Sequence, residues 1–124
     1  TTLLDDLIKA RSYIAAGWTQ YVVARNAEGQ VVLPTDPEAV DRCLGGAVEA
    51  AINYKDKYDL HRYRMVLRAL AEQTPVDPTL SIDWAATWND EPERTIVEVL
   101  DLFDRAIKVQ KHIEEESMVN EVKL

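Results

Sequence analysis

Hydrophobic residues recur at helical spacing in four segments of the chain, which predicts four helices. The first helix follows Thr2, a residue suited to the N-cap position, and ends before Gly17. The second starts at residues 35–38, Thr-Asp-Pro-Glu, which combine capping side chains with a proline in the first turn. The third spans about residues 59–73 and ends at a Thr-Pro pair.

The fourth and longest helix is predicted to start at Asp90, and its inward-facing hydrophobic residues continue to Ile107. Past Ile113, three successive glutamates precede a sparse apolar pattern. We therefore expect one compact domain over residues 1–113 and an extended or frayed C-terminal tail over residues 114–124.

A different pattern follows the first helix. Residues 21–23 and 31–33 are rich in β-branched and aromatic side chains, and residues 26–29, Asn-Ala-Glu-Gly, suit a turn closed by a left-handed glycine. This predicts a β-hairpin over residues 19–33, which must lie on helices or join another strand because two strands alone are marginally stable. The predicted fold class is mainly α (α+β): a four-helix domain with one β-hairpin after the first helix and a long C-terminal helix.

The second predicted helix contains two glycines and the single cysteine of the chain. Gly45 and Gly46 each cost about 1 kcal/mol relative to alanine, so another backbone or a large ring should lie close to them. Cys43 as a nucleophile would need His61 or His112 as its base, but it stands in an apolar stripe and both histidines stand among polar residues. We interpret Cys43 as a core residue and expect no catalytic residue.

Composition limits the possible partners. The chain has 124 residues, with 22 acidic and 14 basic side chains and a net charge of −8, which disfavours duplex nucleic acid and anionic membranes. One cysteine excludes an intramolecular disulfide framework. Because no apolar run reaches the length of a membrane span and no signal-like segment opens the chain, we expect a cytoplasmic protein.

The acidic charge is unevenly distributed. Residues 1–70 contain equal numbers of acids and bases, so residues 71–124 carry the whole net charge. This predicts an acidic face on the last helix that binds a protein partner, while apolar residues in the tail would allow self-association. The alternative is that this face packs against the basic segment of residues 55–68. The candidate partner-binding residues are Glu98, Asp101, Asp104, Met118, Val119 and Val122.

Aromatic residues suggest a second kind of site. Trp18 and Trp88 could form an aromatic pocket edged by Gln20, Asn89 and Asp90, which would suit a small ligand. This gives the alternative function, a small-molecule-binding domain or an enzyme. The competing interpretation is that the rings, with Trp84, fill the core of a small domain.

Metal binding has weaker support. Residues 77–83 alternate oxygen-bearing side chains as a calcium loop does, but Ile82 occupies the position that requires glycine. A divalent site among Asp83, Asp90, Glu91 and Glu93 stays open, although helix capping explains most of that cluster. We expect no metal and no cofactor.

Three short motifs carry a resemblance. They are Gly17-Trp18-x-Gln20, Cys43-x-x-Gly46-Ala47, and Trp88-Asn89-Asp90 followed by Thr95 and Glu98-Val99-Leu100. With these motifs the chain resembles a family of small uncharacterised domains from actinobacteria and their bacteriophages, over about residues 3–107. The resemblance implies a mostly helical fold and a phage or actinobacterial origin, and it implies no activity. We expect a small, acidic, non-enzymatic interaction protein.

Overall fold

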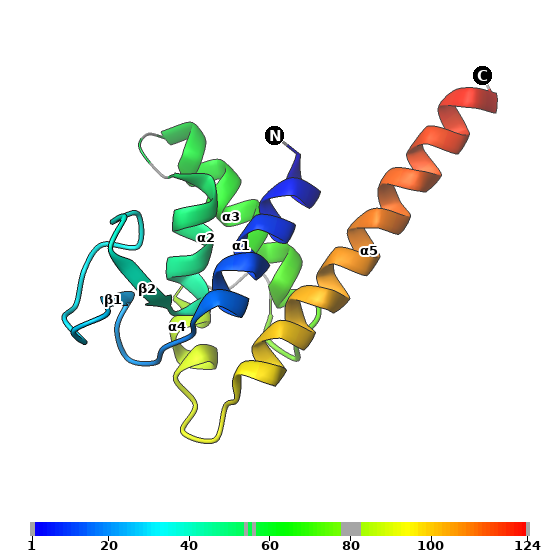
Figure 1. The fold of residues 1–124 in the computed structure, drawn as a ribbon. Coiled ribbons are helices and arrows are strands. Elements are labelled where there is room, and N and C mark those ends of the chain that lie inside the picture. Colours follow the sequence, from blue (N-terminus) through cyan, green and yellow to red (C-terminus); the bar gives the residue numbers. More distant parts are fainter. Residues whose placement is uncertain (1, 54, 56, 78–82, 124) are drawn as a thin grey trace.

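The computed structural model describes residues 2–53, 55, 57–77 and 83–123. They form five helices and two short strands (Figure 1). The elements are α1 (Leu3–Ala16), β1 (Ala24–Asn26), β2 (Ala39–Arg42), α2 (Leu44–Ile52), α3 (Lys57–Ala71), α4 (Trp84–Asn89) and α5 (Ile96–Lys123). The predicted fold class, mainly α with an antiparallel hairpin after the first helix and a long C-terminal helix, is confirmed. The additional helix is the short α4.

The hydrophobic core lies among all five helices, with α1 packed against both α2 and α5. Of the helices that the structure describes, none is both long and apolar enough to cross a membrane. The core comprises Leu7, Ala10 and Ile14 of α1, Leu44, Ala47, Val48, Ala51 and Ile52 of α2, Val66, Leu67, Leu70 and Ala71 of α3, Trp84 and Ala85 of α4, and Val99, Leu102, Phe103, Ala106 and Ile107 of α5.

The ends of α1 agree with the sequence. Thr2 and Asp5 form a capping box, in which each side chain accepts a hydrogen bond from the other residue's backbone N–H. Gly17 ends the helix in an extended conformation rather than a left-handed one. A Cβ atom at Gly17 would overlap the carbonyl group of Val40 and the carboxylate of Asp41, so close approach explains the glycine.

The hairpin has different bounds from the predicted 19–33. The turn ending at Gly29 forms as expected, but β1 pairs with β2 rather than with residues 31–33, which contribute one isolated bridge. β2 is favoured because it has partners on both sides: it pairs with β1, and Arg42 exchanges backbone hydrogen bonds with Gly17 and Thr19. The second predicted strand is therefore a connecting loop.

The start of the central helix was also predicted wrongly. Instead of a helix start, residues 33–39 form two successive turns, closed by hydrogen bonds from the Asp36 N–H to the Leu33 carbonyl and from the Ala39 N–H to the Asp36 carbonyl. The Asp36 carboxylate also accepts a hydrogen bond from the Glu38 N–H, 2.8 Å between heavy atoms. Helix α2 begins only at Leu44, with Cys43 as the N-cap. An aspartate and a proline favour an isolated turn as strongly as a helix start, and the pairing of β2 decides between them.

Both glycines of α2 lie close to neighbouring elements, as expected from the free energy that glycine costs inside a helix. A Cβ atom on Gly46 would overlap the carbonyl oxygen of Val23, which precedes β1. A Cβ atom on Gly45 would lie 3.1 Å from the Tyr63 hydroxyl of α3. Gly46 therefore allows the hairpin to approach the helix closely.

Helix α5 starts and ends later than predicted. Asp90 is the C-cap of α4, and α5 begins at Ile96 behind a Thr95–Glu98 capping box. The expected extended or frayed tail over residues 114–124 is instead helical as far as Lys123. Strong helix formers and side-chain pairs four residues apart, such as His112–Glu116, account for this continuation.

Candidate functional site

The Asn89 side chain is the centre of a hydrogen-bond network that joins three segments of the chain. Asn89 is fully buried at the end of α4. Its Oδ1 accepts hydrogen bonds from Trp18 Nε1 at 2.7 Å and from the Leu44 N–H at 3.1 Å. Its Nδ2 donates to the Thr19 carbonyl at 3.1 Å and to Asp90 Oδ1 at 3.0 Å. All of its hydrogen-bonding capacity toward the protein is used inside the fold.

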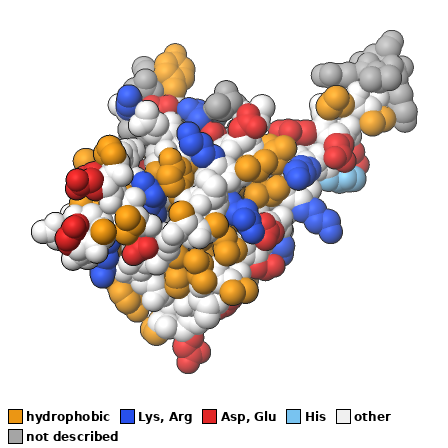
Figure 2. Space-filling model, in the orientation of Figure 1, with side chains coloured by type: hydrophobic (Ala, Val, Ile, Leu, Met, Phe, Trp, Pro, Cys, Tyr) orange, Lys and Arg blue, Asp and Glu red, His pale blue; other side chains and the backbone are white. Residues whose placement is uncertain are grey.

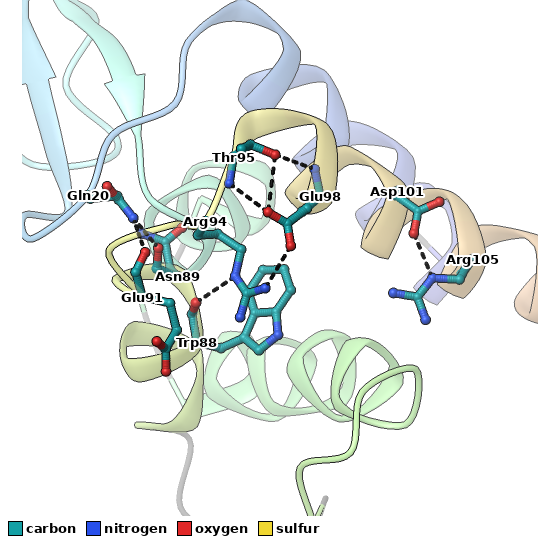
Figure 3. A network of polar contacts seen from close by, with 9 residues as sticks. All are labelled: Gln20, Trp88, Asn89, Glu91, Arg94, Thr95, Glu98, Asp101 and Arg105. Atoms are coloured by element: carbon teal, nitrogen blue, oxygen red, sulfur yellow. Dashed lines mark hydrogen bonds and ion pairs between the residues drawn. The ribbon is translucent and has the colours of Figure 1, made fainter.

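Gln20 and Asp90 extend this network. Gln20 Nε2 donates to the carbonyl oxygens of Asn89 at 2.9 Å and of Glu91 at 2.8 Å, as Figure 3 shows. Asp90 Oδ1 accepts from the Tyr21 N–H at 2.8 Å, and Tyr21 has a positive φ of 71°. We call Trp18, Gln20, Asn89 and Asp90 the Asn89 network. The structure thus brings together four of the five predicted ligand-binding residues, with their polar groups directed at one another.

The fifth residue, Trp88, lies in a separate groove. The Arg94 guanidinium stacks over its ring, 3.7 Å from the ring centroid, and Arg94 Nε donates to the Trp88 carbonyl oxygen (Figure 3). The groove has a volume of 460 Å³ and is also lined by Val97, Glu98 and Asp101. Trp88 therefore lies beside the predicted acidic face. The third tryptophan, Trp84, is a core residue.

Each of the three predicted acidic residues on α5 has an arginine partner. Glu98 pairs with Arg94 at 3.1 Å, Asp101 with Arg105 at 2.9 Å, and Asp104 with Arg11 of α1 at 2.6 Å. Hydrogen bonds from Thr95, the backbone N–H foremost, and the Arg94 contact lower the pKa of Glu98. The acidic face therefore carries less free charge than the sequence suggests.

The basic segment of residues 55–68 makes ion pairs with acids near it and on α1. Arg62 contacts Asp6 at 2.7 Å, and this hydrogen bond is the main cause of a raised Arg62 pKa. Arg68 lies 3.6 Å from Glu72. The Arg62–Asp6 pair links α3 to α1, and both contacts account for part of the segment's positive charge without the acids of α5.

The far half of α5 exposes its apolar side chains. Met118 is 65% and Val119 51% exposed, and the side chain of Val122 lies outside the described residues. The sequence analysis missed two further residues, Val109 and Ile113, which are 41% and 51% exposed. Their spacing of four residues, on the edge of the inward stripe, is the signal that could have identified them.

Cys43 is a helix cap rather than a residue inside a helix. Its Sγ accepts a hydrogen bond from the Gly46 N–H at 3.3 Å, and burial raises the pKa of the thiol. It lines a small cavity of 140 Å³ with Glu49, whose pKa burial also raises. Within the described part of the chain, no three His, Cys, Asp or Glu side chains lie close enough to hold a metal ion. The position of Ser81 and Ile82 lies outside that part.

Comparison with known proteins places the chain in a family. No curated protein and no solved structure matches it. A family model, DUF6197, described as a family of unknown function, matches residues 1–109. The matched range spans the positions of all three motifs and ends where α5 leaves the core. The chain therefore belongs to the DUF6197 family.

Proposed function

We propose that this chain is a non-enzymatic protein-interaction domain that docks through residues 108–123, which we call the projecting half of α5. The observation that supports the proposal is the contrast between helical order and burial. The last buried residue of α5 is Ile107, and no side chain described between Lys108 and Val119 is buried, yet the helix continues to Lys123. Figure 1 shows this half extending away from the other helices.

Such a helix gains stability from a partner. Helices without tertiary packing are marginally stable in water, because backbone entropy nearly cancels the hydrogen bonds gained. Val109 and Ile113 are one helical turn apart on the same face of α5. Their burial against another surface would supply part of the missing hydrophobic contribution. Figure 2 shows hydrophobic side chains near the outer end of this segment, beside acidic and histidine side chains.

The order of charges favours a second copy of the chain as the partner. Lys108 and Lys111 precede the acidic run Glu114–Glu116. In an antiparallel pair of helices that cross near His112, the lysines of each copy would face the glutamates of the other. Such a pairing is self-complementary, as a two-fold symmetric dimer requires. Glu98, Asp101 and Asp104, which already have arginine partners, would contribute less to it.

The alternative function, ligand binding in an aromatic pocket, has less support. Asn89 and Gln20 direct their polar atoms at backbone and side-chain partners within the fold. A ligand would have to break these hydrogen bonds before forming its own. The Asn89 network is better explained as the structural link between α2, α4 and residues 18–20, which lead from α1 to β1.

A charge-exchange experiment tests the proposal. One variant carries Lys108→Glu and Lys111→Glu, and the other carries Glu114→Lys, Glu115→Lys and Glu116→Lys. In light scattering, the original chain should form dimers, each variant alone should be monomeric, and their mixture should form mixed dimers. A monomeric original chain at its highest soluble concentration, with a monomeric mixture, would exclude the second copy as partner.

The proposal extends to origin and compartment. The motifs that end in Trp88-Asn89-Asp90 and Glu98-Val99-Leu100 support an actinobacterial or phage source. A single, half-buried cysteine fits a reducing cytoplasm, that of the host if a phage encodes the chain.

A further inference from the structure

A further cleft lies away from both sites considered so far. It has a volume of 640 Å³, within the range of small-molecule sites, and is bounded by α1, the loop that leads into β2, and the end of α2. Its lining includes Lys9, Tyr13, Asp36, Arg42 and Asn53. We call it the Arg42 cleft. None of its lining residues belongs to α5, so it is independent of the proposed docking helix.

Arg42 is held rigidly in this cleft. The residue is only 7% exposed, its Nε donates to the Pro34 carbonyl oxygen at 2.8 Å, and its guanidinium carbon lies 4.3 Å from the centroid of the Tyr13 ring. Its backbone is bonded to Gly17 and Thr19 on one side of β2. The guanidinium is therefore fixed before any ligand arrives, which reduces the entropy lost on binding.

The terminal nitrogens of Arg42 lack an acceptor. Within the described part of the chain, neither Nη1 nor Nη2 makes a hydrogen bond or an ion pair. Neither atom is among the fully buried atoms that lack a partner, so the fork opens to solvent in the cleft. An arginine fork of this kind matches the paired oxygens of a carboxylate or a phosphate. The structure thus contains a fixed donor pair with no partner from its own fold.

The remaining charges of the cleft favour an anion. Lys9 adds a second positive charge, and Asp36 is the one carboxylate among the lining residues described. The Oδ1 atom of Asp36 already accepts a hydrogen bond from the Glu38 N–H. This net positive cleft is found in a chain whose net charge is −8.

We propose that the Arg42 cleft binds a small molecule through an oxyanion group, either a carboxylate or a phosphate. The Nη atoms of Arg42 donate to two oxygens of that group, and Lys9 supplies the second positive charge. Tyr13 and Pro37 provide apolar walls for the body of the ligand.

Titration of the full chain with two probes, inorganic phosphate and benzoate, tests this inference. In ¹⁵N–¹H NMR spectra, at least one probe should shift the amide signals of Tyr13, Arg42 and Asn53 and reach saturation, whereas sodium chloride at equal ionic strength should not. The probe with the higher affinity identifies the preferred oxyanion.

Two variants and a control separate binding from folding. Lys9→Gln alters only a surface position and should weaken binding about tenfold, as expected for one charge-assisted contact. Arg42→Lys removes the fork and should abolish saturation, while Lys111→Gln on the projecting half of α5 should change nothing. The inference is overturned if neither probe gives saturable shifts, or if Lys9→Gln binds as tightly as Lys111→Gln.

Discussion

The Asn89 network and the projecting half of α5 are opposite cases of how polar and apolar groups are satisfied. Around Asn89, buried polar atoms find partners from three segments far apart in the sequence. On the projecting half of α5, apolar side chains such as Met118 stand in solvent on a well-formed helix. Where the sequence suggested a ligand site, the polar side chains therefore have partners within the fold. Where it suggested a tail, apolar side chains are exposed to solvent.

This difference teaches how to separate structural from functional residues in a small domain. A tryptophan next to an asparagine and an aspartate looks like a binding wall until the partners of each polar atom are known. An exposed apolar helix has no internal explanation of that kind. Free hydrogen-bonding or hydrophobic capacity, rather than residue type, indicates where a partner is needed.

Replacing Asn89 with alanine should have the largest effect. The substitution leaves the Trp18 Nε1 and Leu44 N–H donors without an acceptor in a buried site. We expect a loss of about 3 kcal/mol in the free energy of unfolding, measured with urea. Gln110→Ala, on α5, is the control and should cost well under 1 kcal/mol because its one side-chain hydrogen bond is to Glu114 of the same helix. Equal losses would mean that the network does not link the segments energetically.

Substitutions of the two glycines of α2 test how tightly the buried part of the fold is packed. Gly46→Ala should destabilise the fold by about 2 kcal/mol, because its Cβ meets a backbone carbonyl that cannot move without displacing the hairpin. Gly45→Ala should be close to neutral, because helix propensity improves and the Tyr63 hydroxyl is the end of a movable side chain. Thermal unfolding of the Gly45→Ala and Gly46→Ala variants, compared with the original chain, measures both effects. A larger loss for Gly45→Ala would mean that the hairpin yields more easily than α3.

These residues also mark how far sequence alone could reach. The spacing of hydrophobic residues predicted the main helices, and the cost of Gly45 and Gly46 predicted a close neighbour. The pairing of β2 with both β1 and the chain at Gly17 could not be predicted, since it depends on contacts between distant segments. That pairing moved the start of α2 to Leu44.

The candidate sites likewise depend on contacts between distant segments that the sequence does not show. The sequence predicted that Trp18, Gln20, Asn89 and Asp90 lie together, and the structure shows that they hydrogen-bond to one another. Arg42 was missed, because the sequence placed it inside the predicted second helix, as a polar position between Val40 and Cys43. Nothing in the local pattern indicates a guanidinium buried over Tyr13.

Removing residues 111–124 tests whether the projecting half of α5 contributes to the stability of the fold. No described side chain in this stretch is buried, so the free energy of unfolding of the dilute, monomeric protein should change by less than about 0.5 kcal/mol. Urea unfolding at low protein concentration measures it. A loss comparable to that of Asn89→Ala would show that the projecting half of α5 packs on the body and would contradict the proposed docking role.

Glu98 lies in the first turn of α5, and its titration should show the smallest effect. Hydrogen bonds from Thr95, the backbone N–H foremost, and the contact with Arg94 hold the pKa of Glu98 below its ordinary value of 4.5. A carboxylate with a lowered folded pKa stabilises the fold above its unfolded pKa, and this contribution is lost as the pH falls through the folded pKa. Stability should therefore decline below about pH 4.5, and Glu98→Gln should flatten that decline. NMR titration of the Glu98 carboxyl carbon measures the pKa directly. Arg94→Gln should raise it only part of the way, because the Thr95 N–H remains; complete restoration would mean that the arginine, rather than the capping box, sets the charge at the start of α5.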